Sequence, residues 1–373
     1  MKAKRRVVPG TPTRRTPTVR TVRPAIRSPH GPGRVARAGG EPAPPTAAST
    51  DILGGRPVSL AVDLGRGLVL RTPMIGASGP FGYGAEVADA VDLGRLGALV
   101  TRGTTLRPRA GHAAPRTADV PAGLLVGVGL QNPGVEAVLE RYAETWARWP
   151  LPVIVNVCGE SSADMAEVAR RLDGVAGVAG LELNLSCSNG GRAAFGLDEG
   201  AAGSLVAAVR RATDLPLVAK LTAAAGNVRA VARAVEDAGA DAISAINTLP
   251  GLVLGADRAA SAVGSGYGGV CGPALRPIAL RVVHEVSQVV DVPVIGVGGV
   301  TTVEDALDLL AAGASAVGVG VAALADPMLP VRLGDELAEA CRGRGLEDVR
   351  GLVGTALPAR AAAASTRGAE YAR

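Results

Sequence analysis

Aromatic residues are scarce in this chain. They make up 2% of its 373 residues, and Phe81 is the first of them. Because 47% of the residues are hydrophobic, a sizeable core is still available, and it must be built from Ala, Val, Leu and Ile packed closely with Gly. The length fits a single α/β barrel with extensions, since such barrels run to about 250 residues or more.

Cysteines and long apolar runs are also rare. The four cysteines, Cys158, Cys187, Cys271 and Cys341, form no CxxC pair, which excludes a disulfide framework and a zinc-ligand pattern. We therefore expect no metal site and a reduced, cytoplasmic protein. The sequence has no run of about 18 apolar residues and no apolar core of a secretory signal, so neither a membrane span nor secretion is predicted.

Positive charge is concentrated at the N-terminus. The formal net charge is +5, yet the first 50 residues hold eleven Lys and Arg against one acid, Glu41. The remainder is net negative and gives no electrostatic argument for nucleic-acid binding. Residues 1–55 predict a disordered tail, although a transit peptide or a start codon assigned too early would look similar. We expect a barrel over residues 56–345 and a partly disordered extension over 346–373.

Short β-branched runs alternate with longer helix-like segments from residue 66 onward. The runs are continuously apolar rather than alternating, as in a parallel sheet that is covered on both faces. Eight such runs are present, at residues 67–78, 98–103, 152–159, 180–187, 216–221, 242–248, 293–299 and 315–322.

Two of the intervening segments have clear helical periodicity. One helical face would carry Val228, Val231, Val235 and Ala238 in the first, and Val303, Ala306, Leu307 and Leu310 in the second. Thr302 and Asp305 resemble a capping box, and Gly239 and Gly313 stand where a helix C-terminal cap is expected. Eight strand–helix units predict a (β/α)8 TIM barrel. A doubly wound open sheet is the alternative, because periodicity does not show closure.

Polar residues gather where the predicted strands end, which is where ligands bind in a parallel barrel. Asn and Thr also cap helices and close turns, but so many strand ends carry polar residues that we predict a shared ligand site. The residues are Ser78, Arg102, Thr104, Thr105, Asn156, Asn184, Ser186, Cys187, Lys220, Asn247 and Thr248.

Two glycine clusters complete the pattern. GVGGV (296–300) and GVGVA (318–322) coincide with the last two predicted strands, and loops at these positions commonly hold phosphate in such barrels. Glycine lets backbone N–H groups approach phosphate oxygens, although tight turns alone would also explain the clusters. A phosphate held there, with a lysine further round, indicates flavin mononucleotide (FMN) or a phosphorylated sugar.

The chain from about residue 58 to 330 resembles class 1 dihydroorotate dehydrogenases. The short segment after Cys187 is similar to class 1B, the NAD-linked type. The matching stretches, in the family's order, are ASGPFGYG (77–84), TTLRPR (104–109), GLQNPG (129–134), NVCG (156–159), ELNLSCSN (182–189), AFGLD (194–198), AKL (219–221), INT (246–248), GGVCGPALRP (268–277), GVGG (296–299) and ADP (325–327).

This resemblance implies a barrel that holds FMN at its C-terminal mouth. The implied cofactor residues are Ser78, Arg102, Gly103, Asn156, Asn184, Lys220, Ile246, Gly272, Gly298, Gly299, Gly320 and Val321. The implied substrate residues are Arg102, Val126, Gly127, Val128, Gly129, Leu130, Asn184, Asn247 and Thr248. Cys187 matches the family's catalytic base, which takes the C5 proton of dihydroorotate while hydride passes to N5 of FMN. Lys220 would stabilise negative charge on the reduced ring.

The resemblance also implies partners. Class 1B catalytic subunits work with a subunit that carries FAD and an iron–sulfur centre, and a homodimeric core is expected by analogy. No residue of this chain accounts for NAD binding.

Several positions depart from the family pattern. The family usually has Lys at Arg102, Asn at Val126 and Pro at Ser188, and Ser-Pro-Asn where this chain has TAA (222–224). The first two positions normally contact orotate, and neither replacement is neutral. Three hypotheses follow: a dihydroorotate dehydrogenase with an altered pocket, a related FMN oxidoreductase acting on another ring or enone, and a flavin- or phosphate-binding barrel without catalysis.

Overall fold

The computed structural model describes residues 58–186 and 194–358. The predicted tail over residues 1–55 lies outside these ranges, as do Cys187, Ser188 and residues 359–373.

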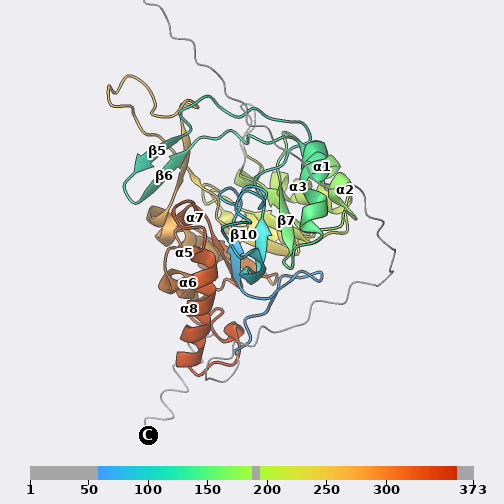
Figure 1. Cartoon of the computed structure of the whole chain (residues 1–373), viewed down its shortest axis with the longest axis vertical. Helices are drawn as coiled ribbons and strands as arrows, with labels where there is room; N and C mark the ends of the chain where they lie inside the picture. Colours follow the sequence, from blue (N-terminus) through green and yellow to red (C-terminus); the bar gives the residue numbers. More distant parts are fainter. Residues whose placement is uncertain (1–57, 187–193, 359–373) are drawn as a thin grey trace, which may run out of the picture. The chain divides into compact units, whose positions relative to one another are not determined.

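Eight parallel strands form a closed barrel (Figure 1). Around the barrel the strands follow the order β10-β13-β14-β3-β4-β7-β8-β9, and β9 pairs with β10 to complete the ring. Every predicted apolar run overlaps one of these strands, so the closed barrel is confirmed and the open-sheet alternative is wrong. The strands are β3 (Met74–Gly76), β4 (Ala98–Val100), β7 (Val153–Val157), β8 (Val178–Asn184), β9 (Leu217–Lys220), β10 (Ala242–Ala245), β13 (Val294–Val297) and β14 (Ala316–Val319).

Helices follow most of the strands and bury their apolar faces on the barrel. All five residues of β7 are buried, as expected for a strand with side chains packed on both faces. The helices are α1 (Val135–Trp146), α2 (Ser162–Leu172), α3 (Glu199–Arg210), α4 (Val228–Asp237), α5 (Arg276–Val286), α6 (Val303–Ala311), α7 (Ala322–Ala325) and α8 (Leu329–Gly343).

The segment between β3 and β4 departs from the predicted strand–helix pattern. It contains only the 3-10 helix η1 (Leu93–Arg95). Gly79, Gly82 and Gly84 have φ values of 114°, 59° and 90°. Three residues with positive φ within six positions prevent a continuous α-helix here. This irregular segment brings Ser78 and Pro80 to the mouth of the barrel.

The predicted helix ends are confirmed. Thr302 and Asp305 form a capping box at the start of α6, and Gly239 and Gly313 follow α4 and α6 with φ values of 97° and 115°. The predicted apolar faces are confirmed in part. Helix α4 buries three of the four expected residues, whereas Ala238 is its C-cap.

The buried face of α6 is displaced from the prediction. Ala306 and Leu310 are buried as expected, together with Leu309. Val303 and Leu307 lie at the edge of the core, where they are only partly buried. The observed buried face is therefore rotated about the helix axis relative to the predicted one. A short amphipathic pattern does not determine this rotation.

A second sheet, not predicted from the sequence, is built from two loops of the barrel. Its antiparallel order is β11-β12-β6-β5, with bounds Leu249–Gly251, Gly268–Cys271, Gly123–Val126 and Thr117–Val120. The β5–β6 hairpin stands beside the barrel in Figure 1. A further pair, β1 (Val62–Asp63) and β2 (Val69–Leu70), precedes the barrel. The strands of the second sheet and of this pair have only two to four residues each, so they have little hydrophobic periodicity.

Part of the predicted C-terminal extension packs on the barrel domain. The 3-10 helix η4 (Val349–Gly351) buries Val349, and Ser59 donates a backbone hydrogen bond of 2.8 Å to Glu347. The described part of the chain contains no helix that is both long and apolar enough to cross a membrane.

Three of the aromatic residues form one cluster. The rings of Tyr83 and Tyr142 stack with centroids 4.7 Å apart, and Tyr142 stacks on Trp146 at 5.9 Å. The Trp146 Nε1 donates a hydrogen bond of 3.0 Å to the Tyr83 carbonyl. Burial raises the pKa of Tyr83 from 10.0 to about 12, an effect that a hydrogen bond with Thr104 opposes.

Tyr83 should make the folded protein sensitive to alkaline pH. Between pH 10 and 12 the unfolded chain loses a phenolic proton that the folded chain retains, so the free energy of unfolding should fall as pH rises through this range. Urea unfolding at stepped pH would measure the fall. The Tyr83→Phe variant should lose this contribution, whereas Tyr267→Phe, which removes an exposed hydroxyl, should keep it. Equal pH dependence in all three proteins would contradict the prediction.

Candidate functional site

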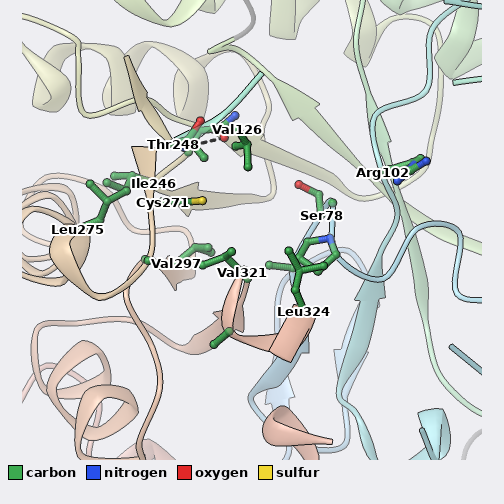
Figure 2. A pocket seen from close by; sticks show the side chains of 18 of the residues that line it. Ser78, Arg102, Val126, Ile246, Thr248, Cys271, Leu275, Val297, Val321 and Leu324 are labelled. Carbon is green, nitrogen blue, oxygen red and sulfur yellow. Dashed lines mark hydrogen bonds between the residues drawn. The ribbon is translucent and has the colours of Figure 1, made fainter. Parts of the chain in front are cut away.

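A cavity of about 420 Å³ opens at the C-terminal ends of the barrel strands (Figure 2). Its size falls within the range of small-molecule and cofactor sites, about 300–1,000 Å³. All twelve positions predicted to contact the cofactor line it: Ser78, Arg102, Gly103, Asn156, Asn184, Lys220, Ile246, Gly272, Gly298, Gly299, Gly320 and Val321.

The predicted substrate positions divide into two groups. Arg102, Val126, Val128, Leu130, Asn184, Asn247 and Thr248 line the cavity, whereas Gly127 and Gly129 do not. Gly127 turns away and donates a backbone hydrogen bond of 2.7 Å to Arg116.

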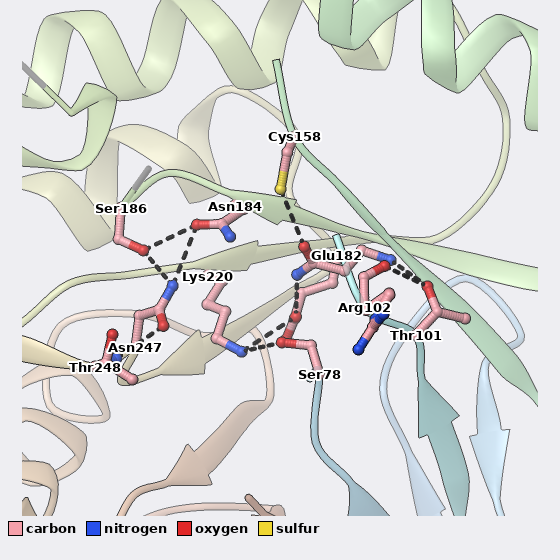
Figure 3. A network of polar contacts seen from close by, with 11 residues as sticks. Ser78, Thr101, Arg102, Cys158, Glu182, Asn184, Ser186, Lys220, Asn247 and Thr248 are labelled. Atoms are coloured by element: carbon pink, nitrogen blue, oxygen red, sulfur yellow. Dashed lines mark hydrogen bonds and ion pairs between the residues drawn. The ribbon is translucent and has the colours of Figure 1, made fainter. Parts of the chain in front are cut away.

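One polar group at the cavity is built around Asn184, the last residue of β8. Its Oδ1 accepts hydrogen bonds from Ser186 Oγ at 2.9 Å and from Asn247 Nδ2 at 3.2 Å (Figure 3). Asn247 Oδ1 in turn accepts from the backbone N–H of Thr248 at 2.8 Å. The three side chains fix one another, so their remaining donors and acceptors are oriented before a ligand arrives. Cys187, the predicted base, follows Ser186 directly but lies outside the described residues.

A second polar group lies deeper and contains an ion pair. Lys220 Nζ donates to Ser78 Oγ at 2.9 Å and is 3.3 Å from Glu182 Oε2. The same carboxylate oxygen accepts from Asn156 Nδ2 at 2.6 Å, and Asn156 Oδ1 accepts from the thiol of Cys158 at 3.3 Å (Figure 3). Sequence reasoning missed Glu182, although an acidic residue inside an apolar strand is a signal that could have found it.

Arg102 is the cation that stands apart from these groups. Its half-buried side chain lines the cavity, and it forms no hydrogen bond or ion pair with another described residue. Val126, which also lines the cavity, offers only an apolar side chain. A guanidinium that is held near a cavity without an internal partner can bind a carboxylate through two parallel hydrogen bonds.

Of the three described cysteines, Cys271 lines the cavity, whereas Cys158 and Cys341 are buried. Cys271 was not among the site residues predicted from the sequence. Burial raises the pKa of the Cys271 thiol, and its Sγ donates to the Leu124 carbonyl at 3.4 Å. The raised pKa favours the protonated thiol near neutral pH.

The glycines after β13 and β14 form a wall of exposed backbone. Gly298 and Gly299 have φ values of 139° and 76°, and a Cβ on Gly320 would meet no atom within 4 Å. The backbone N–H groups of Gly298, Gly299, Gly320 and Val321 donate to no other described residue. Four such donors on one side of a cavity suit an anionic group.

Asp305 holds the first of these loops in place. Its carboxylate accepts from the backbone N–H groups of Thr301 and Thr302 at 2.8 and 2.9 Å and pairs with Arg276 at 2.7 Å. Burial would raise the pKa of Asp305, but these hydrogen bonds and the nearby guanidinium outweigh it and lower the pKa. The carboxylate therefore remains ionised at neutral pH and ties the loop to the start of α6 and to α5.

Comparison with known proteins agrees with this geometry. The family model described as Dihydroorotate dehydrogenase matches residues 60–341. The chain is similar to three proteins named dihydroorotate dehydrogenase B (NAD(+)), catalytic subunit. The one from Desulforudis audaxviator is 44% identical over 78% of this chain and 95% of its own length. The Pelobacter propionicus protein is 45% identical over 77% and 95%, and the Porphyromonas gingivalis protein 41% over 80% and 98%. The chain belongs to the dihydroorotate dehydrogenase family.

Proposed function

We propose that this chain binds FMN in the cavity and oxidises dihydroorotate to orotate, the step that serves pyrimidine biosynthesis. The observation that carries the proposal is that the twelve positions matching the family's cofactor contacts all face one cavity. When bound, FMN supplies the acceptor for the hydride removed from the substrate. Side chains and backbone groups of this chain would bind the cofactor and the substrate and remove the substrate proton.

The glycine wall is the part of the cavity that fits a phosphate. A side chain at Gly299 or Gly298 would not fit, because a Cβ there would lie 2.6 Å from Arg276 Cβ or 2.8 Å from Ala279 Cβ. The backbone therefore runs close to α5 on one side and presents its N–H groups on the other. These N–H groups, with those of Gly320 and Val321, would hold the phosphate of FMN.

The middle of the cavity fits a polar ring system. Lys220 and Ser78 form one polar edge, and Asn156 lies on β7, which is separated from the strand of Lys220 by β8. These groups would hydrogen-bond the heteroatoms of the isoalloxazine ring, and the lysine would favour negative charge on it. The apolar side chains of Ile246, Val297 and Val321 face the same space (Figure 2).

The substrate would occupy the side of the cavity nearest Asn184. The amides of Asn184 and Asn247 and the hydroxyl of Thr248 provide the hydrogen-bonding edge that a pyrimidine requires. Cys187 follows this group in sequence, and as a thiolate it would remove the C5 proton of dihydroorotate. Arg102 would bind the substrate carboxylate.

A second candidate function is favoured by the contacts at Arg102 and Val126. Val126 removes a donor and an acceptor that the family usually has at this position, and an unpaired polar group on a buried ligand costs about 1–3 kcal/mol. An FMN-dependent oxidation of another carboxylate-bearing ring or enone would use the same cavity.

A partner protein is also proposed. The similar proteins are named catalytic subunits, and class 1B enzymes pass electrons to a subunit with FAD and an iron–sulfur centre. Leu252, Leu254 and Tyr267 expose large apolar surfaces at the second sheet, which supports a protein-binding face there. We propose that this chain also forms a homodimeric core.

Dihydroorotate should reduce the bound flavin of the purified protein. Anaerobic mixing should bleach the visible FMN absorbance, and Cys187→Ala should slow this step by roughly 100-fold or more, in line with the usual contribution of a general base. Cys271→Ala is the matched control, since Cys271 is a cavity thiol whose raised pKa keeps it protonated. In the Cys271→Ala variant, dihydroorotate should reduce the bound flavin at close to the wild-type rate.

The outcomes separate the candidate functions. Bound FMN that dihydroorotate does not bleach would rule out the first function and favour the second. Equal rates of flavin reduction in Cys187→Ala and the wild type would exclude Cys187 as the base. Slow flavin reduction in Cys271→Ala would instead indicate that Cys271 is the base.

Restoring the usual family residues should tighten orotate binding if dihydroorotate is the substrate. Val126→Asn regains a hydrogen-bonding group at the cavity wall, and the double variant with Arg102→Lys tests whether the family's pair of residues adds to that gain, since Arg102 already offers a carboxylate two hydrogen bonds. Each recovered hydrogen bond should be worth about 1 kcal/mol, or roughly fivefold in the orotate dissociation constant. Flavin spectral titration with orotate would measure it. No change in either variant would favour a different substrate.

Gly299→Ala should weaken FMN binding about tenfold or more. The new Cβ would lie 2.7 Å from the Arg276 backbone nitrogen at a φ of 76°, so the loop must move and its N–H groups lose their alignment. Gly343→Ala at the end of α8 meets no atom within 4 Å and should leave FMN affinity unchanged. Fluorescence titration of the apoprotein with FMN measures both, and equal affinities would contradict the role of the loop.

A further inference from the structure

Glu182 is a charged side chain in the interior of the barrel. It lies in the middle of β8, a strand whose last five residues are all buried, and only 3% of its surface is exposed. It does not line the cavity itself. A buried carboxylate is strongly unfavourable unless it is paired and hydrogen-bonded, so the partners of Glu182 explain why an acid is tolerated there.

Those partners come from the strands on both sides of β8. Glu182 is the direct register neighbour of Asn156 in β7, and Lys220 in β9 is the register neighbour of Asn184, two residues further along β8. Residues two apart on a strand point to the same side. The single atom Glu182 Oε2 accepts from Asn156 Nδ2 at 2.6 Å and contacts Lys220 Nζ at 3.3 Å.

These contacts restrain the two cavity side chains that flank Glu182. Lys220 Nζ is held between Glu182 Oε2 and Ser78 Oγ. Asn156 has its Nδ2 engaged by Glu182 and its Oδ1 engaged by the Cys158 thiol, so the amide cannot flip without losing both bonds. A carboxylate that binds a lysine and an amide through one oxygen thus fixes two flexible groups at once (Figure 3).

We propose that Glu182 is a positioning residue: it orients Lys220 and Asn156 toward the cavity and offsets the charge of Lys220. The proposal rests on the proposed binding of FMN there. Lys220 presents a cation to the ligand, and Glu182 behind it reduces the field of that cation. Without the carboxylate the lysine would be uncompensated in a place of low dielectric, and the site would favour added negative charge more strongly.

The test is Glu182→Gln, which keeps the shape of the side chain and removes its charge. The bound FMN of the full-length variant should have a more positive midpoint potential than that of the wild type, because an uncompensated Lys220 favours the reduced, more negative cofactor. FMN affinity should fall about tenfold, because Lys220 and Asn156 lose the charged acceptor that holds them toward the cavity. Dye-equilibrated reductive titration and fluorescence titration of the apoprotein measure the two quantities.

Glu160→Gln is the matched control. Glu160 is 62% exposed and pairs with Arg109 at 2.8 Å, so removal of its charge should change neither the potential nor the affinity. A potential and an affinity at wild-type values in Glu182→Gln would overturn the proposal. If the wild-type protein failed to bind FMN at all, the proposed function would fail first, so the two failures are distinguishable.

A double variant decides the case if Glu182→Gln does not fold. Glu182→Gln combined with Lys220→Met removes both charges and leaves neither one buried alone. If the single variant fails because Lys220 has lost its counter-charge, the double variant should fold and unfold at a higher temperature than either single variant. A double variant that is no more stable than Glu182→Gln would overturn the pairing.

Discussion

The register of three neighbouring strands is the constraint on which the site depends. Parallel pairing of β7, β8 and β9 places Asn156 beside Glu182 and Asn184 beside Lys220. Because side chains alternate along a strand, the same register turns all four polar groups toward the barrel interior. A shift of one residue in β8 would move Glu182 and Asn184 to the helix-facing side and place apolar residues opposite Lys220. The chemistry and the packing are therefore set by one pairing pattern.

The cavity divides by charge along its length. Backbone N–H groups supply the donors at the glycine wall, a compensated ion pair lies below the centre, and Arg102, whose side chain pairs with no other described residue, lies on a third side. Each region offers positive or donor character in a different form. The arrangement suits a ligand pair that carries a phosphate, a polar ring and a carboxylate.

The barrel could be predicted from the sequence because its strands are continuously apolar and its helices begin and end with strong local signals. Thr302 and Asp305 show this well, since a capping box depends only on residues close in sequence. The second sheet could not be predicted in this way. Its strands have three or four residues each, and β12 contains Gly268 and Gly269, so their pairing is decided by tertiary contacts.

The site was predictable where a residue stands at a strand end and less so elsewhere. Ser78, Asn184 and Lys220 are polar interruptions of apolar runs, which made them visible. Glu182 is equally polar, but its role depends on contacts with Lys220 and Asn156 from other strands. These contacts join residues far apart in the sequence, so they could not be predicted from it. Cys271 lies at the site because β12 pairs with β6, and these strands are almost 150 residues apart in the sequence.

The two-loop origin of the second sheet has an evolutionary consequence. Val126 and Gly269 are register partners on strands that come from different barrel loops, and a Cβ on Gly269 would meet the Thr248 hydroxyl at 2.1 Å. A side chain at Gly269 would therefore need a compensating change at Thr248, which lines the cavity, so the rim and the ligand site can change only together.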